Sequence, residues 1–134
     1  PLEERVKTYI EEKKLTKYIK LLGSRNDTVE LYQGMDAFFL PSFFEGLPVT
    51  GVEAQAMGLS MVVSDTVTRE MVYTDLVDYV SLNDTPEAWA SRLEIALRKN
   101  AKREQYADRL KLSNFSNIGC GNRLEQVYCW WING

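Results

Sequence analysis

The chain has 134 residues, a hydrophobic content of 45%, a charged content of 26% and a formal net charge of −3 at pH 7. This length is enough for one domain with a hydrophobic core, the composition argues against disorder, and the slightly acidic balance argues against a nucleic-acid-binding surface. There is no apolar run long enough to span a bilayer and no signal-peptide pattern, so we expect a cytoplasmic protein.

The first part of the chain is predicted to alternate helix, strand and helix. Residues 2–15 have the charged amphipathic pattern of a helix, and residues 18–22 form a short apolar segment that we interpret as a strand. A second helix is expected over residues 27–33. Asp27 offers its N-cap, and Glu30 three residues later completes a pair that resembles a capping box.

An apolar strand over residues 37–40 is followed by a loop and a third helix. Pro41 marks the turn after the strand, and the loop then carries Glu45 and Gly46. Pro48 suits the first position of the helix, because the N–H that proline lacks would be unpaired there. In open α/β sheets, ligands bind in the crevice beyond the carboxyl ends of the strands, so this loop is the candidate site.

Glu53 lies inside the third helix, in an unusual position. At about 100° per residue, it falls within an arc of apolar residues. A charged carboxylate on a core-facing arc is costly unless it is hydrogen-bonded or opens onto a polar cleft. A position at the rim of the arc, paired with an Arg or Lys, is an equally good interpretation. The other members of the arc are Val49, Val52, Ala56 and Met57.

The second half of the chain continues the alternation. Residues 60–64 and 79–82 are short apolar segments predicted as strands, with a short helix expected over residues 66–73. Thr85 and Pro86 indicate a helix start, because threonine caps well and proline suits the first helical position. The buried stripe of this helix is expected at Trp89, Leu93, Ala96 and Leu97.

Two more helices are predicted towards the carboxyl end. Residues 101–112 interleave acidic and basic side chains, which is typical of a solvated face, and residue 116 or 117 starts the last helix. Cys120 and Cys129 would stand about 13 Å apart on that helix, too far for a disulfide bond. We expect both thiols to be buried or half-buried, and we expect no metal site, because the chain has no histidine.

Short apolar strands that alternate with helices predict an α/β fold. We expect a Rossmann-like parallel sheet of about four short strands flanked by helices, in a single domain over residues 1–134. No composition shift or low-complexity stretch divides the chain.

The loop and the third helix also carry a resemblance. Residues 44–54, Phe-Glu-Gly-Leu-Pro-Val-Thr-Gly-Val-Glu-Ala, resemble the E-x7-E signature of the retaining glycosyltransferases of family 4, which are GT-B enzymes with nucleotide-sugar donors. Residues 22–27 resemble the F-L-G-x-R-x-D turn of that family, residues 35–42 its A-D-x-F-V-L-P-S strand, and residues 54–65 its E-A-Q-A-x-G-L-P-V-V-x-S-D run. This succession in the right order is much more specific than a lone E-x7-E.

The resemblance implies a set of site residues. Glu45 would contact the donor sugar or lie close to its anomeric centre, and Glu53 would accept hydrogen bonds from the ribose hydroxyls. The start of the third helix would present amides and its positive dipole end to the diphosphate. The residues implied there are Gly46, Leu47 and Pro48, and those implied at the nucleobase are Gly23, Ser24, Arg25 and Asn26.

The substrates implied by the resemblance are a nucleotide-sugar donor and an acceptor in polysaccharide or glycoconjugate synthesis. UDP is the commonest donor nucleotide of the family, although GDP and ADP also occur, and neither a cofactor nor a metal is implied. Gly51 stands where the family usually has a larger apolar residue, and we expect it on the outer side of its helix.

The resemblance further implies that this chain is the carboxy-terminal part of a donor-binding domain, inactive alone, with the acceptor-binding amino-terminal domain of the same protein as its partner. Residues 115–132 would be the terminal crossing helix, where Trp130 and Trp131 either bury a second face or form a small exposed patch. We expect strands 18–22 and 37–40 to lack neighbours, and therefore either to pair directly or to be the place where two chains meet. The full enzyme would be peripheral to the membrane.

Two other interpretations stay open. A nucleotide-sugar epimerase or phosphorylase of the GT-B architecture would share the fold, but the P-S-x-x-E-G-L run over residues 41–47 favours a transferase. A non-catalytic α/β module of the flavodoxin or receiver type belongs to a different class. A receiver needs an acidic cluster at the end of its first strand, and no predicted strand here ends that way.

Overall fold

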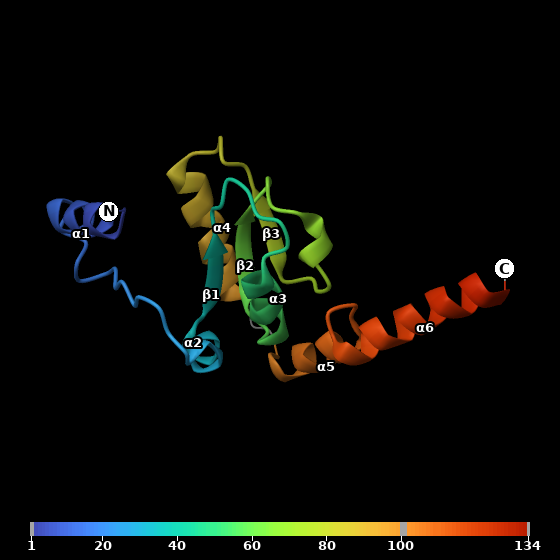
Figure 1. Ribbon diagram of the computed structural model, residues 1–134. Helices are drawn as coiled ribbons and strands as arrows, with labels where there is room; N and C mark the ends of the chain where they lie inside the picture. Colours follow the sequence, from blue (N-terminus) through green and yellow to red (C-terminus); the bar gives the residue numbers. More distant parts are fainter. Residues whose placement is uncertain (1, 100–101, 134) are drawn as a thin grey trace.

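The computed structural model of the chain describes residues 2–99 and 102–133, except for the side chains of residues 127, 128 and 130–133. Figure 1 shows an open sheet with helices on both faces, an amino-terminal helix that stands apart from it, and a carboxy-terminal helix that extends away as an arm. The elements in chain order are α1 (Leu2–Glu12), α2 (Thr28–Gly34), β1 (Ala37–Leu40), α3 (Val49–Ala56), β2 (Ser60–Ser64), the 3-10 helix η1 (Arg69–Met71), β3 (Val77–Val80), α4 (Pro86–Arg98), α5 (Glu104–Leu112) and α6 (Asn117–Asn133).

The sheet is parallel, with strand order β1-β2-β3. Its central strand β2 is buried along its whole length. Side chains alternate along this strand: Met61 and Val63 pack into the core cluster that includes residues of α3 and η1, whereas Val62 packs with Trp89 of α4. The α/β class and the parallel Rossmann-like arrangement are therefore confirmed, with three strands in the described residues where about four were expected.

The predicted strand over residues 18–22 is wrong. This segment has no strand structure, and Tyr18, Ile19, Leu21 and Leu22 are all exposed. A strand forms only when another strand supplies hydrogen bonds, and β1 pairs with β2 instead. Direct pairing of residues 18–22 with β1 is therefore also wrong, and in the described part of the chain the other edge of β1 has no partner strand.

The ends of several other elements differ from the prediction, and α5, expected from residue 101, begins at Glu104. The last strand is Val77–Val80 instead of residues 79–82, because its register matches Met61 to Val77 and Ser64 to Val80, so both strands end together. The helix expected over residues 66–73 is only the short η1, capped by the Thr68 hydroxyl, which accepts a hydrogen bond from the Glu70 N–H.

Helix α1 ends earlier than residue 15. The N–H of Leu15 bonds to the carbonyl of Ile10 at 2.8 Å, and the N–H of Lys14 bonds to that of Glu11 at 2.9 Å. Lys14 has a left-handed backbone with φ of 56°. This is a Schellman motif, which closes the helix and places Leu15 back against Ile10.

The capping box predicted for α2 does not form. Asp27 precedes the helix but makes no side-chain cap. Its carboxylate instead accepts hydrogen bonds from Arg25, with Nε at 2.7 Å from Oδ1 and Nη2 on Oδ2. The hydrogen bond from Arg25 lowers the pKa of the Asp27 carboxyl below its ordinary value. A charged guanidinium two residues away is a stronger donor than a backbone N–H, and so it takes the carboxylate.

Helix α4 starts as predicted. The Thr85 hydroxyl accepts a hydrogen bond from the Ala88 N–H, and Pro86 is the first helical residue. Trp89 is buried, donates its indole N–H to the Ser81 carbonyl at 3.0 Å, and meets the Phe39 ring edge-on. Leu97 is the exception in the predicted stripe, because it is 55% exposed.

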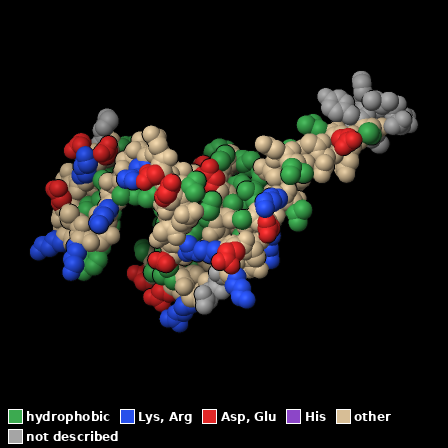
Figure 2. Space-filling view, turned by 90° about the horizontal axis from the view of Figure 1, so that it is seen from below, with side chains coloured by type: hydrophobic (Ala, Val, Ile, Leu, Met, Phe, Trp, Pro, Cys, Tyr) green, Lys and Arg blue, Asp and Glu red, His purple; other side chains and the backbone are tan. Residues whose placement is uncertain are grey.

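Helix α5 packs on α3 and has Tyr106 as its buried residue, and α6 then leaves the body, as Figure 2 also shows from below. Cys120 and Cys129 are exposed on α6, so the expectation of buried or half-buried thiols is wrong. The predicted roles of Trp130 and Trp131 fall on side chains outside the described residues. No helix in the described part of the chain is long and apolar enough to cross a membrane.

Candidate functional site

The loop over residues 41–48 lies above the carboxyl ends of β1 and β2 in Figure 1. Its conformation is fixed from below by two hydroxyls at the end of β2. The Ser42 carbonyl accepts hydrogen bonds from the Ser64 hydroxyl and from the Thr66 hydroxyl, the latter at 2.9 Å. Ser64 is fully buried. The loop is therefore tied to the strand beside it, at the sheet edge where ligands of open α/β sheets bind.

Glu45 is held within this loop. It is half-buried, and its Oε1 accepts a hydrogen bond from the Ser42 hydroxyl at 2.8 Å. Ser42 thus uses its carbonyl to anchor the loop and its hydroxyl to orient the carboxylate. Gly46 follows in an exposed position with open space around it. A backbone without side chain at this point leaves room for a ligand to approach the amides closely.

Helix α3 begins at Val49, one residue later than predicted. Pro48 is buried and occupies the N-cap position with an extended backbone, and Leu47 before it is 47% exposed. No side chain caps this end. The first amides of a helix have no partner within it and carry the positive end of its dipole, so this uncapped end suits an anion.

Glu53 lies on the exposed side of α3, so its predicted place on a core-facing arc is wrong, although Val52 and Ala56 of that arc are buried. Val49 is also exposed, whereas Gly51, Val52, Ala54, Gln55 and Ala56 are buried. The buried side is the one that faces β2, α5 and η1. The expectation that Gly51 lies on the outer side is wrong as well, because a Cβ there would come within 2.8 Å of the Met71 sulfur.

The carboxylate of Glu53 has a defined partner. Its Oε2 accepts a hydrogen bond from the Tyr32 hydroxyl at 3.1 Å, and no Lys or Arg in the described ranges pairs with it. Burial, with a smaller contribution from this hydrogen bond, raises the pKa of Tyr32 to about 12. The tyrosine is therefore a neutral hydrogen-bond donor throughout the physiological range.

Gln55 fastens the inner side of α3. Its side chain is fully buried and donates to the carbonyls of Gly51 at 3.0 Å and Met71 at 2.9 Å. Its Oε1 accepts from the Tyr73 N–H at 3.2 Å and from the Thr74 hydroxyl at 2.9 Å. These bonds connect the helix that carries Glu53 to the segment after η1, so the helix is firmly positioned.

The turn over Gly23, Ser24, Arg25 and Asn26 is exposed and is not hydrogen-bonded to the loop that holds Glu45. Gly23 has a left-handed backbone with φ of 66°. Arg25 is engaged with Asp27. The turn leads into α2, and α2 carries Tyr32 to Glu53.

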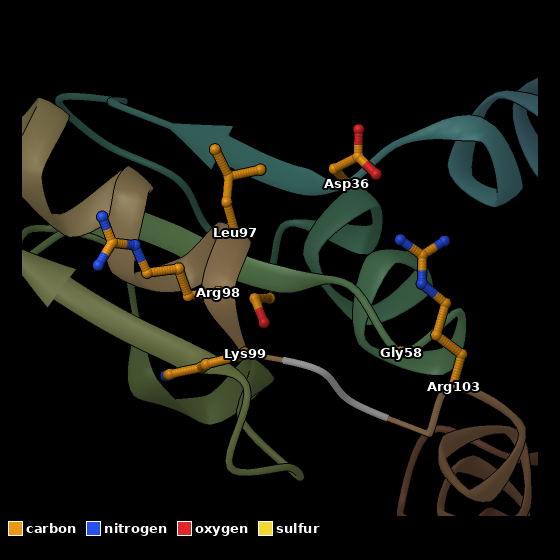
Figure 3. Close-up of a pocket in the computed structure, with 7 residues that line it drawn as sticks. Asp36, Gly58, Leu97, Arg98, Lys99 and Arg103 are labelled. Atoms are coloured by element: carbon orange, nitrogen blue, oxygen red, sulfur yellow. The ribbon is translucent and has the colours of Figure 1, made fainter.

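A hollow of about 310 Å³ lies at the opposite edge of the sheet, beside the starts of β1 and β2. Figure 3 shows that Arg98 and Lys99 point away from Arg103 across it. Lys99 is paired with Asp78 at 2.8 Å, and Arg103 donates to the carbonyls of Gln33 and Met35. The Lys and Arg side chains that line the hollow do not converge on one point, and the hollow does not lie at the carboxyl ends of the strands. It is therefore a poor candidate for the ligand-binding site.

Three residues of the site were not assigned a role from the sequence. They are Ser42, which holds Glu45, Tyr32, which holds Glu53, and Gln55, which holds α3. The spacing of Ser42 and Glu45 is local and could have indicated their contact. The described residues contain no cluster of His, Cys, Asp or Glu that could hold a metal ion.

Residues 1–112 match the protein family described as glycosyl transferases group 1. The EpsF protein of Bacillus subtilis (strain 168), which carries a glycosyltransferase name, is 31% identical over 107 residues, or 79% of this chain and 28% of that protein. The chain thus spans less than a third of the length of this relative. No solved structure gives a significant match.

Two other relatives match over shorter segments. The N,N'-diacetylbacillosaminyl-diphospho-undecaprenol alpha-1,3-N-acetylgalactosaminyltransferase of Campylobacter jejuni (serotype O:2) is 53% identical over 47 residues, covering 35% of this chain and 12% of that protein. The UDP-Gal:alpha-D-GlcNAc-diphosphoundecaprenol alpha-1,3-galactosyltransferase of Escherichia coli is 45% identical over 51 residues, covering 38% of this chain and 13% of that protein.

Proposed function

The chain belongs to the glycosyl transferases group 1 family, and we propose that it is the donor-binding part of an enzyme that transfers a sugar from a nucleotide-sugar to an acceptor with retention of configuration. The observation that carries the proposal is the arrangement at the carboxyl edge of the sheet. Two carboxylates, each oriented by a hydroxyl, lie on either side of the uncapped start of α3 in the sequence.

Each carboxylate has a separate role in this proposal. Glu45 lies in the loop and contacts the donor sugar close to its anomeric carbon. Glu53 lies in the second turn of α3 and accepts hydrogen bonds from the ribose hydroxyls, which its exposure on the helix allows. An oriented, exposed carboxylate is suited to hydroxyl recognition, because both of its oxygens accept hydrogen bonds.

The diphosphate binds at the start of α3, where Gly46 and Leu47 offer backbone amides and the helix offers its positive end. The nucleobase contacts the turn formed by Gly23, Ser24, Arg25 and Asn26. The nearby carboxylates are negative, like the diphosphate, and cannot offset its charge. We therefore propose that the complete enzyme supplies cations from residues outside this chain. We therefore expect residues 1–134 alone to be catalytically inactive.

We assign residues 1–134 to one donor domain, which works with the acceptor-binding amino-terminal domain of the same protein. The remaining strands of the donor domain would lie between β1 and residues 18–22. They would cover the exposed apolar side chains of residues 18–22. Without those strands, two copies of the chain would meet at the unpaired edge of β1. Residues 115–132 are the crossing helix to the other domain.

For the substrates, we propose a UDP-sugar as donor and a lipid-linked sugar as acceptor. One relative is named for UDP-Gal, and two are named for sugars on diphospho-undecaprenol. Transfer to such an acceptor is a step of polysaccharide or glycoconjugate synthesis at the cytoplasmic face of a membrane, with the enzyme bound peripherally.

The test is a calorimetric titration of the chain with UDP, GDP and ADP, repeated with the Glu53→Gln variant. We expect UDP to bind in preference to the other two, and the variant to bind it at least about tenfold more weakly, since a hydrogen bond to a charged group contributes about 1.5–3 kcal/mol. Glu70→Gln is the matched control, because that glutamate is exposed on η1. Equal affinity of the wild type and Glu53→Gln for UDP would contradict the ribose role of Glu53.

A further inference from the structure

Tyr32 combines a buried ring with a hydroxyl that reaches the site. The residue is only 6% exposed, belongs to the core cluster with Val52 and Ala54, and has the Phe38 ring 6.0 Å away. Its hydroxyl lies 3.1 Å from Glu53 Oε2 and 3.5 Å from the Thr50 carbonyl. The ring is thus anchored, and its polar end is directed at one side chain of α3.

We propose that the Tyr32 hydroxyl is the positioning group that presents the Glu53 carboxylate to the ribose of the donor nucleotide. This inference rests on the ribose role proposed for Glu53. An exposed glutamate on a helix samples several rotamers, and ordering it on ligand binding costs conformational entropy. The bond from Tyr32 selects one rotamer before the ligand arrives, and it occupies Oε2 while Oε1 stays available to the ribose hydroxyls.

The chain offers a reason why a tyrosine stands here. A tyrosine side chain has only two torsions, so burying its ring fixes the hydroxyl at low entropic cost. A lysine or arginine at the same place would neutralise the carboxylate and compete with the ribose for its lone pairs. The phenol stays neutral, because burial and the contact with Glu53 raise its pKa to about 12. The contact of Tyr32 with Glu53 is therefore a hydrogen bond from a neutral donor and not an ion pair.

The position of Tyr32 also connects two parts of the site. Helix α2 begins at Thr28, directly after the turn over residues 23–26 that is assigned to the nucleobase. Helix α2 and the hydrogen bond from Tyr32 to Glu53 therefore connect the turn that contacts the base to the carboxylate that contacts the ribose. Tyr32 is a positioning residue in this account, since it touches the carboxylate and not the nucleotide.

The test compares UDP with 2′,3′-dideoxy-UDP, which lacks both ribose hydroxyls, on the full chain. The wild type is expected to prefer UDP. Tyr32→Phe removes only the hydroxyl and should weaken UDP by about tenfold, at the low end for a hydrogen bond to a charged group, while leaving dideoxy-UDP nearly unchanged. Tyr73→Phe is the matched control, because its hydroxyl also bonds to α3, at 2.9 Å from the Val52 carbonyl. It should not change the preference.

Three results decide between the possible roles. Equal loss of affinity for both nucleotides in Tyr32→Phe, or the same behaviour as Tyr73→Phe, would reduce Tyr32 to a packing residue and overturn the inference. In the Glu53→Gln background, Tyr32→Phe should have no further effect on UDP affinity, and an independent effect would also overturn it. A Glu53→Gln variant with wild-type UDP affinity would instead refute the ribose role, and the inference with it.

A spectroscopic titration separates the contact from its use. In Glu53→Gln the pKa of Tyr32 should fall from its raised value, because the carboxylate charge is lost while the burial of the ring stays. If that fall is seen and Tyr32→Phe still leaves the ribose preference intact, the hydrogen bond exists but does not serve binding. That combination overturns the inference and leaves the proposed function standing.

Discussion

Replacing Gln55 with leucine should lower the free energy of unfolding by about 4 kcal/mol, because buried hydrogen-bonding groups that lose their partner cost about 1–3 kcal/mol each. Leucine has a similar volume and would fill the space. It would, however, leave the Met71 carbonyl and the Tyr73 N–H without the partners they have now, at 2.9 Å and 3.2 Å. Chemical denaturation of the wild type and the variant measures this difference.

The matched control is Gln33→Leu, which makes the same chemical change on α2 at an exposed side chain. It should alter stability by less than about 0.5 kcal/mol, as is usual for surface positions. If Gln55→Leu were no more destabilising than this control, Gln55 would not be the internal fastener of α3, and the rigidity assigned to the helix that bears Glu53 would have to come from elsewhere.

The second large effect is expected at Gly58, which closes α3. The residue has a left-handed backbone with φ of 68°, and the bonds Leu59 N–H to Ala54 carbonyl and Gly58 N–H to Gln55 carbonyl form a Schellman motif. A Cβ added here would lie 2.7 Å from the Cα of Arg103. Gly58→Ala should therefore lower the free energy of unfolding by about 3 kcal/mol, from left-handed strain and from overpacking together.

Gly34→Ala provides the comparison for Gly58→Ala. Gly34 is the last residue of α2, has no left-handed backbone, and has open space where a Cβ would go. Its replacement should be neutral or slightly stabilising, because alanine restricts the unfolded chain. Thermal melts of the two variants side by side would show the contrast, and equal melting temperatures would contradict the close approach of Arg103 to Gly58.

The parts of the fold that the sequence predicted correctly are those set by local patterns. The runs at residues 37–40 and 60–64 are apolar and flanked by turn signals, and both are strands. Thr85 and Pro86 fix the start of α4 through a cap within the same turn. Residues 18–22 have a similar apolar pattern but no strand beside them, and a single segment contains no information about its hydrogen-bond partner.

In the candidate site too, the features set by local patterns were predictable and those set by tertiary contacts were not. The loop–helix order around Glu45 was predictable, because it follows from proline, glycine and the apolar strand before them. The direction of Glu53 was not, since an eight-residue helix has several arcs of similar character and tertiary neighbours decide which one is buried. Its contact with Tyr32 joins residues 21 positions apart, and no local spacing encodes it.

The donor nucleotide is proposed to bind at the carboxyl edge of the sheet, around the start of α3. The most direct measurement is an NMR titration of the isotopically labelled chain with UDP, following each backbone amide. We expect the largest shift changes at Gly46, Leu47 and the first turn of α3, with Gly58 and Arg103 unaffected. Changes centred on the hollow lined by Gly58, Lys99 and Arg103, or no change at saturating UDP, would contradict it.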